Sequence, residues 1–390
     1  MPIVSRRESP LDLPGHAPVL DGIRGLAVLQ VVLGHTHYML TSDPYGVAIS
    51  RWSIVNRITQ PGDLGLDIFF TLSGFLITSL LLRDYERRAQ TTETAGSVFR
   101  RFYARRALRL LPALYVMLAL DWLLVLWEGF DIHRQWRTTY SALLYIANWA
   151  SVWNVQETNG DLGHLWSLAV EEQFYIVWPL ALFGIWSLRR RPWAQLGIIA
   201  VAVVLIAQHR TTAYVNGLSW LYAYIRTDMR VDSMLVGAFF AILHRYVKVD
   251  RTLAWIVGTI GLGVICWYKF LAPLEGMFGY TPRDMYRFGF TRNAVMVGLC
   301  ILAAVSSSWW FNRVLSFKPL VMLGKFSYGL YLYHHVVFHA VMRHLGQHGQ
   351  GVRLAVGYGL SALLTFLSWK LVEKPCLNLK KRFESPRSSV

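Results

Sequence analysis

The sequence has few charged residues and very few cysteines. Asp, Glu, Lys and Arg make up 16% of the 390 residues, whereas roughly a quarter is usual in a soluble domain. The three cysteines, Cys266, Cys300 and Cys376, have no paired spacing, so neither a disulfide framework nor a cysteine zinc site is expected. The first residues include Arg6 and Arg7 but no apolar run, so no cleavable signal peptide is expected.

Apolar and aromatic residues take the place of the missing charge. Hydrophobic residues make up 54% of the chain, and the mean hydropathy is +0.35. They gather in blocks of about 17–25 residues, the length that a helix needs to cross the hydrocarbon layer. Trp and Tyr residues flank many of these blocks, as they do at the level of the lipid headgroups. We therefore predict an all-α, polytopic integral membrane bundle with about ten transmembrane helices.

The apolar blocks define the predicted spans, and 139–151 is excluded from them. That segment is too short to cross a bilayer and is assigned to an interfacial or re-entrant helix. The predicted spans are 20–40, 64–82, 108–127, 164–187, 194–209, 218–243, 253–271, 291–306, 320–342 and 353–372. One miscounted helix would invert the direction of every later span.

Positive charge predicts the orientation of these spans. Lys and Arg gather in the segments that share a side with the N-terminus, so the positive-inside rule places both chain ends in the cytoplasm of a bacterial inner membrane. The net charge of +16 is assigned to this topology and to membrane lipids as partners, not to nucleic acid. The chain is accordingly divided into a cytoplasmic tail at 1–16, a membrane domain at 17–376 and a basic cytoplasmic tail at 377–390.

Polar side chains interrupt the first predicted span. A charged side chain inside a bilayer costs at least about 2.5–3.5 kcal/mol, so each one indicates a partner, a pore or a site. In LDGIRGLAVLQVVLGH, residues 20–35, Arg24 and His35 are separated by close to three helical turns and lie on one face, about 16 Å apart. Asp21 lies one turn before Arg24 and can pair with it. The alternative for His35 is a packing histidine that is hydrogen-bonded within the bundle.

Two further motifs carry polar residues, and the second of them, FYARRALRLLP, lies at a predicted cytoplasmic membrane edge. In GLDIFFTLSGFLIT, residues 65–78, Asp67, Ser73 and Gly74 favour close helix packing. In FYARRALRLLP, residues 102–112, the guanidinium groups of Arg106 and Arg109 suit the phosphates of a nucleotide-bearing donor. Binding of anionic lipid headgroups explains the same arginines equally well.

The motif GHLWSLAVEEQFYIVWP, residues 163–179, places a carboxylate at the start of a span. His164 and Glu171 share one helical face, with Ser167 one turn before Glu171. Glu171 with a histidine suits proton handling. The alternative is a buried ion pair between Glu171 and Arg226 or Arg230.

Two later motifs contain further intramembrane polar groups. In YIRTDMRVDSMLVG, residues 224–237, Arg226 and Arg230 are expected to share one helical face and Asp228 and Asp232 another. These residues favour a satisfied network that holds helices together.

In GKFSYGLYLYHHVVFH, residues 324–339, Ser327, Tyr331 and His335 form one stripe. His335 and His339 have the spacing of metal ligands, but no third ligand is evident, so no metal is expected.

Together, these motifs resemble the membrane acyltransferase-3 family, which includes bacterial O-acyltransferases of surface glycans and of macrolides. The resemblance runs from about Leu20 to Pro375 and includes the closing VEKP at 372–375. It implies an acyl-CoA donor, acetyl-CoA by default, and an acceptor hydroxyl on a sugar, a surface glycan or a macrolide-like molecule.

The resemblance also implies roles for individual residues. His35 matches the family's catalytic histidine, and Arg24 matches its partner arginine. Arg106 and Arg109 match the paired arginines of the cytoplasmic loop, and Glu171 matches a family carboxylate.

The resulting hypothesis is a membrane acyltransferase. Coenzyme A binds Arg106, Arg109 and Arg24 from the cytoplasm, and its pantetheine arm brings the thioester to His35. His35 then acts as a general base or as a nucleophile, while Glu171 orients an imidazole or holds the acceptor. The expected substrate-binding residues are His164, Ser167, Tyr331 and His335, and the oxyanion donor is left open among Tyr328, Tyr331 and Ser73.

A proton-coupled secondary transporter or flippase is the alternative function. Intramembrane Arg, Asp, Glu and His residues also occur in carriers. Carriers often contain inverted repeats with broken helices, and no internal repeat is visible in the sequence.

Overall fold

The computed structural model describes residues 18–41, 63–154, 160–271, 285–306 and 309–379. These residues form helices and contain no strand. The predicted all-α fold is therefore confirmed. The N-terminal tail at 1–16 and all but the first three residues of the C-terminal tail at 377–390 lie outside the described residues.

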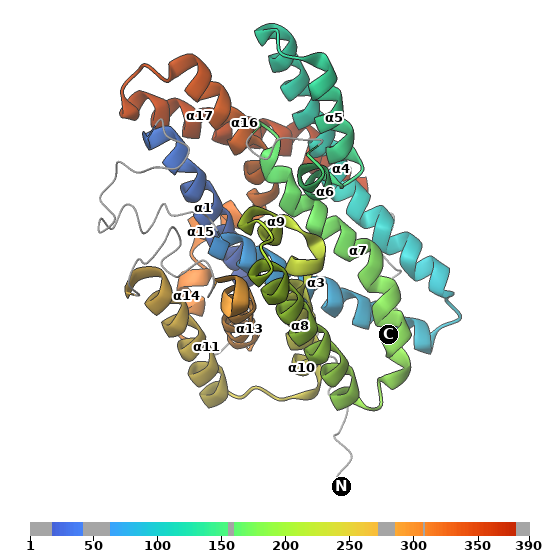
Figure 1. Cartoon of the computed structure of the whole chain (residues 1–390). Helices are drawn as coiled ribbons and strands as arrows, with labels where there is room; N and C mark the ends of the chain where they lie inside the picture. The colour runs from blue at the N-terminus through green and yellow to red at the C-terminus, as the bar shows by residue number, and fades with distance from the viewer. Residues whose placement is uncertain (1–17, 42–62, 155–159, 272–284, 307–308, 380–390) are drawn as a thin grey trace.

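The long helices form a bundle in which α3 and α10 cross near the middle and α17 lies at one edge (Figure 1). The helices are α1 Pro18–Thr41, α3 Asp63–Gln90, α4 Ala95–Glu128, α5 Ile132–Leu143, α6 Ala147–Val152, α7 Trp166–Ile185, α8 Pro192–Val215, α9 Trp220–Ile225, α10 Thr227–Tyr246, α11 Arg251–Cys266, α13 Phe290–Val305, α14 Asn312–Leu315, α15 Lys318–Lys325, α16 Ser327–Leu345, α17 Gln350–Ser368 and α18 Lys374–Leu379. Short 3₁₀ segments are η1 Gly163–Leu165 and η2 Trp186–Leu188. Short π segments are η3 Trp267–Leu271, η4 Met285–Gly289 and η5 Trp369–Glu373.

Eight helical segments among the described residues are long and apolar enough to cross a membrane. The predicted multi-pass membrane architecture agrees with this number, although ten spans were expected. The two remaining predicted spans contain α10, with 20 residues, and α16, with 19 residues. Both helices are long enough to cross, but the arginines and aspartates of α10 and the histidines of α16 lower their hydropathy.

Two predicted spans are broken, which corrects the sequence analysis. The span at 218–243 is interrupted at Arg226, whose backbone is extended between α9 and α10. Arg226 and Arg230 therefore do not share a helical face. The span at 320–342 is interrupted at Phe326, between α15 and α16. The short segment 139–151 is not one helix but the end of α5 and most of α6.

Glycines allow several helices to pack backbone against backbone. A Cβ atom added at Gly22 would lie 1.8 Å from the carbonyl oxygen of Leu315, and one added at Gly25 would lie 2.2 Å from that of Leu320. Gly324 lies equally close to the carbonyl of Asp21 in return. These contacts hold α1 against α14 and α15, as small residues do in membrane proteins.

A second set of close contacts joins α3 to α10. A Cβ atom at Gly74 would lie 1.9 Å from the carbonyl oxygen of Met234, and one at Gly237 would lie 1.9 Å from that of Thr71. The expectation that Gly74 serves helix packing is therefore confirmed. Because α3 also contributes residues to the cavity described below, its contact with α10 positions the site.

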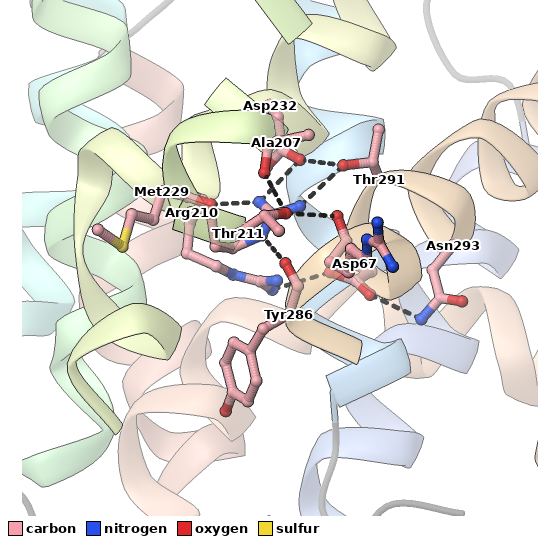
Figure 2. Close-up of polar contacts among 11 residues, drawn as sticks. Asp67, Ala207, Arg210, Thr211, Met229, Asp232, Tyr286, Thr291 and Asn293 are labelled. Atoms are coloured by element: carbon pink, nitrogen blue, oxygen red, sulfur yellow. Dashed lines mark hydrogen bonds and ion pairs between the residues drawn. The ribbon is translucent and has the colours of Figure 1, made fainter. Parts of the chain in front are cut away.

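Buried ion pairs connect four of the helices at one end of the bundle (Figure 2). Arg210 of α8 is fully buried and donates to Asp232 of α10 at 2.9 Å and to Thr291 of α13 at 2.9 Å. Arg230 of α10 donates to Asp67 of α3 at 2.8 Å. Both pairs have no solvent-exposed side-chain surface. The predicted role of Arg230 and Asp232 in holding helices together is confirmed, whereas Arg226 and Asp228 pair with each other. Pairing of this kind is what makes charge tolerable within a membrane.

The glycine contact between α3 and α10 generates a testable prediction. Replacing Gly74 with Ala pushes a methyl group into the Met234 carbonyl, and overpacking of this kind costs about 1–3 kcal/mol. We expect the Gly74→Ala protein to have a lower melting temperature in detergent than the wild type.

Gly184→Ala is the matched control, because nothing lies within 4 Å of the Cβ atom added at Gly184 in α7. That variant should be as stable as the wild type or slightly more stable, since Ala favours helix over Gly by roughly 0.5–1 kcal/mol. Equal melting temperatures for the two variants would contradict the packing argument.

Candidate active site

A cavity of about 120 Å³ lies between five helices of the bundle. Helices α1, α3, α4, α7 and α16 all contribute to its wall. Its polar lining residues are Arg24, Ser73, Arg106, Arg109, Ser167, Glu171, Tyr175, Ser327, Tyr328 and Tyr331. Leu66, Phe69, Phe70, Leu76, Ile77, Leu110 and Leu168 supply the apolar wall. An apolar cavity with a few convergent polar groups is the usual form of a small-molecule site.

Three arginines line the cavity and differ in their partners. Arg24 donates to Asp21 at 2.9 Å, which confirms the predicted pair. Arg106 uses two nitrogens on Glu172, with contacts of 2.5–3.0 Å, and its guanidinium carbon lies 3.2 Å from the centre of the Tyr175 ring. Arg109 is exposed. Of the two arginines predicted to bind phosphate, only Arg109 is therefore without an ion pair among the described residues.

Glu171 lies inside the cavity and forms only weak hydrogen bonds. It accepts from Ser73 of α3 at 3.2 Å and from Tyr175, one turn along α7, at 3.4 Å. The alternative pairing with Arg226 or Arg230 is wrong. Arg226 pairs instead with Asp228 at 2.7 Å, and Arg230 with Asp67. Glu171 therefore remains available to a ligand in the cavity.

Tyr331 belongs both to the cavity and to a group of histidines beyond it. Its hydroxyl donates to the carbonyl oxygen of His164 at 2.5 Å and lies 2.7 Å from the hydroxyl of Ser167. Its ring centre is 5.2 Å from that of His164 and 6.0 Å from that of His334. The structure thus brings the predicted residues His164, Ser167 and Tyr331 together.

His35 lies in this histidine group and not in the cavity wall. Its Nδ1 atom is 3.0 Å from the carbonyl oxygen of Val31 and 3.1 Å from Nε2 of His334. The Nδ1 atom of His334 is 2.8 Å from the carbonyl oxygen of Leu330. A carbonyl can only accept, so each Nδ1 must carry the proton. This assignment leaves Nε2 of His35 with its lone pair, and within the described residues no hydrogen-bond partner occupies it.

The remaining histidines form a stack that continues away from the cavity. The rings of His164 and His335 are stacked, with centres 4.6 Å apart, and those of His335 and His339 are stacked at 4.4 Å. His335 also lies 5.0 Å from His35. We will call His35, His164, His334, His335 and His339 the histidine cluster. In the part of the chain that the structure describes, no group of His, Cys, Asp or Glu has the geometry of a metal site.

Asp161 contacts the histidine cluster at His335 and His339. The carbonyl oxygen of Asp161 accepts from His335 at 2.8 Å, and its carboxylate lies 3.3 Å from His339. Arg343 donates to both carboxylate oxygens, at 2.7 and 2.8 Å. Burial alone would raise the pKa of Asp161, but the hydrogen bonds from His339 and Arg343 outweigh it and lower this pKa to about 2.

Two residues of this arrangement were missed by the sequence analysis. His334 is the histidine that hydrogen-bonds to His35, whereas the stripe of Ser327 and Tyr331 had indicated its neighbour His335. A helical stripe can indicate only one of the two adjacent residues, here His335. That His334 contacts His35 depends on where α1 packs against α16. Glu172, to which no role was assigned from the sequence, is the partner of Arg106; two consecutive carboxylates were the only signal for this pair.

The pKa of Asp161 generates a prediction about stability and pH. Because this pKa is lower in the folded protein than the ordinary value of 3.8, the ionised carboxylate stabilises the fold above about pH 4, and this contribution is lost as the pH falls toward 2. We expect Asp161→Asn to lose roughly 2 kcal/mol of stability at pH 7. Melting temperatures measured from pH 7 down to pH 2 should then fall less steeply for the variant than for the wild type. Parallel curves would contradict the assigned ion pairs.

Comparisons with known proteins identify the family to which this chain belongs. A family model described as an acyltransferase domain matches residues 18–370. The peptidoglycan O-acetyltransferase OatA of Listeria monocytogenes is 30% identical over 337 residues, which are 83% of this chain and 49% of the relative. The putative peptidoglycan O-acetyltransferase YrhL of Bacillus subtilis is 29% identical over 374 residues, which are 92% of this chain and 55% of the relative.

The O-acetyltransferase OatA of Staphylococcus aureus is also 29% identical, over 93% of this chain and 57% of its own length. This chain thus spans about half the length of the curated relatives that it matches. No solved structure matches it. The family match covers nearly the whole membrane bundle, including the cavity and the histidine cluster, and the chain belongs to the acyltransferase domain family.

Proposed function

We propose that this protein is a membrane-bound O-acyltransferase that moves an acyl group, most simply acetyl, from acyl-CoA to a hydroxyl group of a glycan. The observation that carries the proposal is a cavity that has arginines in its wall and meets the histidine cluster at Tyr331. Arginines line it near the predicted cytoplasmic side. At Tyr331 it meets a histidine cluster in which one imidazole has an available lone pair.

The arginines provide a site for the phosphates of coenzyme A. Arg109 is exposed, and Arg24 has one carboxylate partner among the described residues, Asp21 at 2.9 Å. Guanidinium groups donate to phosphate in a fixed, forked geometry. Arg106 is held by Glu172 and Tyr175, so its role is to shape the wall beside Arg109 and to add positive charge. No metal is required by this proposal, since the phosphates meet guanidinium groups directly.

The distance between the arginines and His35 suits a long, thin cofactor arm. Arg24 and His35 are both on α1, and the helical rise between them is about 16 Å. Both residues face α16, because Arg24 lines the cavity with Tyr328 and Tyr331 while His35 contacts His334. A pantetheine arm that follows the cavity from Arg24 therefore reaches the histidine cluster when the Tyr331 side chain moves aside.

His35 has the correct protonation for chemistry on a thioester. Its Nδ1–H is used by Val31 and His334, so Nε2 is the nucleophilic and basic atom. It serves as a general base toward the acceptor hydroxyl or as the nucleophile itself.

An oxyanion donor for the same reaction is found among the three candidates. The hydroxyl of Tyr328 donates to Leu110 at 2.8 Å, and that of Tyr331 donates to His164 at 2.5 Å. The Ser73 hydroxyl makes the longest contact of the three, 3.2 Å to Glu171, and is the donor most easily redirected.

The acceptor is assigned from the relatives and from the chemistry of the cavity. Two of the similar proteins are named as peptidoglycan O-acetyltransferases, and peptidoglycan is a glycan with free hydroxyl groups. Glu171 accepts only two long hydrogen bonds, so a sugar hydroxyl can displace one of them. The proposal for this chain is therefore a hydroxyl-bearing cell-surface glycan.

The alternative of a proton-coupled carrier is weakened by the buried ion pairs. A carrier needs intramembrane charges that alternate in their access to water. Here Arg230 with Asp67 and Arg210 with Asp232 are fully buried and connect helices. The arginines that line the cavity, Arg24, Arg106 and Arg109, suit the binding of an anionic donor.

The role of His35 is tested by substitution. His35→Ala removes the proposed base or nucleophile, so transfer from acetyl-CoA to a peptidoglycan disaccharide should fall by about 10²–10⁴. The measurement is product formation by purified protein in detergent, followed by mass spectrometry. His133→Ala is the control, because His133 is an exposed histidine of α5 that is not a member of the cluster. Full activity of a folded His35→Ala protein would end the proposal.

The role of Arg109 has a different kinetic signature. Loss of a charged hydrogen bond to phosphate costs about 1.5–3 kcal/mol, so Arg109→Ala should raise KM for acetyl-CoA about tenfold or more while leaving kcat largely unchanged. Arg109→Lys should recover part of the loss. Arg100→Ala, which removes an exposed arginine earlier on the same helix, should leave KM unaltered. An unchanged KM in Arg109→Ala would place the phosphates elsewhere.

A further inference from the structure

His164 is the member of the histidine cluster whose ring nitrogens are left open. Its side chain is 5% exposed, and neither Nδ1 nor Nε2 has a hydrogen-bond partner among the described residues. In His35, His334 and His335, by contrast, Nδ1 is hydrogen-bonded to a backbone carbonyl. A buried polar group without a partner is unfavourable, and such groups require an explanation.

The backbone around His164 is held firmly although its ring is not. The Tyr331 hydroxyl donates to the His164 carbonyl, and the Ser167 hydroxyl supports the same tyrosine. His164 belongs to the short segment η1, which leads directly into α7. The position of the His164 imidazole within the cluster is therefore set by its backbone and by ring stacking, without a hydrogen bond to either ring nitrogen. This arrangement leaves both nitrogens available to something that is not part of the chain.

His164 and His35 contact the same two neighbours. The ring centre of His164 is 5.7 Å from His334 and 4.6 Å from His335. That of His35 is 5.0 Å from each of them. The imidazoles of His35 and His164, each with an unused lone pair, thus both lie beside His334 and His335 of α16. Tyr331, which lines the cavity, contacts the His164 ring as well.

We propose that the two histidines divide the reaction: His35 carries the acyl group, and His164 is the general base that activates the acceptor hydroxyl. This proposal rests on the proposed function and deepens it. A second base is needed because an acylated imidazole has used the lone pair with which it could accept a proton. His164 supplies that lone pair and is otherwise without a role in the site.

The two steps balance in atoms and protons. In the first, Nε2 of His35 attacks the thioester carbon, the C–S bond breaks and the thiolate of coenzyme A leaves with the electron pair. The Nδ1 proton of His35 shifts toward Nε2 of His334.

In the second step, the hydroxyl oxygen attacks the acyl carbon and its proton passes to His164. The bond from carbon to Nε2 breaks, and His35 regains its Nδ1 proton from His334. Loss of the proton from His164 to solvent and protonation of the thiolate leave an ester and free coenzyme A.

The test separates these two steps in the purified full chain. Enzyme is mixed with acetyl-CoA in the absence of acceptor, and the thiol released in the first turnover is measured. Either a peptidoglycan disaccharide or hydroxylamine is then added. Hydroxylamine attacks an acyl-imidazole without the help of a base. Because it also attacks a thioester directly, unreacted acetyl-CoA is removed by rapid gel filtration before hydroxylamine is added, so that the hydroxamate reports the acyl-enzyme independently of His164. The variants are His164→Gln, His35→Ala and the control His133→Gln.

The proposal predicts that His164→Gln keeps the wild-type burst of one thiol per enzyme and the wild-type rate of hydroxamate formation. Transfer to the disaccharide should fall at least about 100-fold in the same protein. Because the burst itself requires a folded site, this result also excludes misfolding. The control His133→Gln should match the wild type in all three measurements.

Other outcomes overturn the proposal in distinguishable ways. Loss of the burst in His164→Gln would place His164 in the first step, and unchanged transfer to the disaccharide would leave it without a catalytic role. A wild-type protein that transfers without any burst would show that His35 acts as a base in a single step, which preserves the proposed function but not this division. A burst that persists in His35→Ala would show that another residue carries the acyl group, whereas a wild-type protein that neither releases thiol nor acetylates the disaccharide would overturn the proposed function itself.

Discussion

The hydrogen bond between His35 of α1 and His334 of α16 is the contact on which the proposed chemistry depends. At 3.1 Å, it joins two helices that are 299 residues apart in the chain at this point. The carbonyls of Val31 and Leu330 fix the proton of each histidine on Nδ1. The Nδ1–H of His35 therefore donates to Nε2 of His334 as well, and this contact helps to orient the His35 ring and the lone pair on its Nε2.

The position of α1 in turn depends on helix contacts made elsewhere. Gly22 and Gly25 bring its backbone against Leu315 and Leu320, and Gly324 lies against the carbonyl of Asp21. The buried ion pairs of α3, α8, α10 and α13 hold the other half of the bundle (Figure 2). Polar residues within the membrane therefore fall into two groups. One group is neutralised in pairs and stabilises the bundle, and the other lines a cavity or a cluster and retains unused hydrogen-bonding capacity.

Much of the fold could be predicted from composition, because apolar block length and arginine position are strong signals in a membrane protein. The pairing of Arg24 with Asp21 followed from a spacing of three residues. The breaks at Arg226 and Phe326 could not be predicted, since neither proline nor glycine occupies these positions. They depend on tertiary contacts, such as that of the Arg226 guanidinium with the ring of Trp149.

The candidate site shows the same limit. His35 and Tyr331 were identified because each lies on a helical stripe with other polar residues. The partners of Arg106 and of His35 come from other helices, and the register between helices is set by packing that no local pattern encodes. Glu172 and His334 were missed for this reason, although each is adjacent to a residue that had been selected.

The most direct test of the account is a structure of the protein bound to a thioether analogue of acetyl-CoA. The account predicts that the phosphates lie against Arg109 and Arg24 and that the acetyl carbonyl carbon lies within about 3.5 Å of Nε2 of His35, with the Tyr331 side chain displaced. Phosphates bound at the Asp161 side, or an acetyl group far from His35, would contradict it.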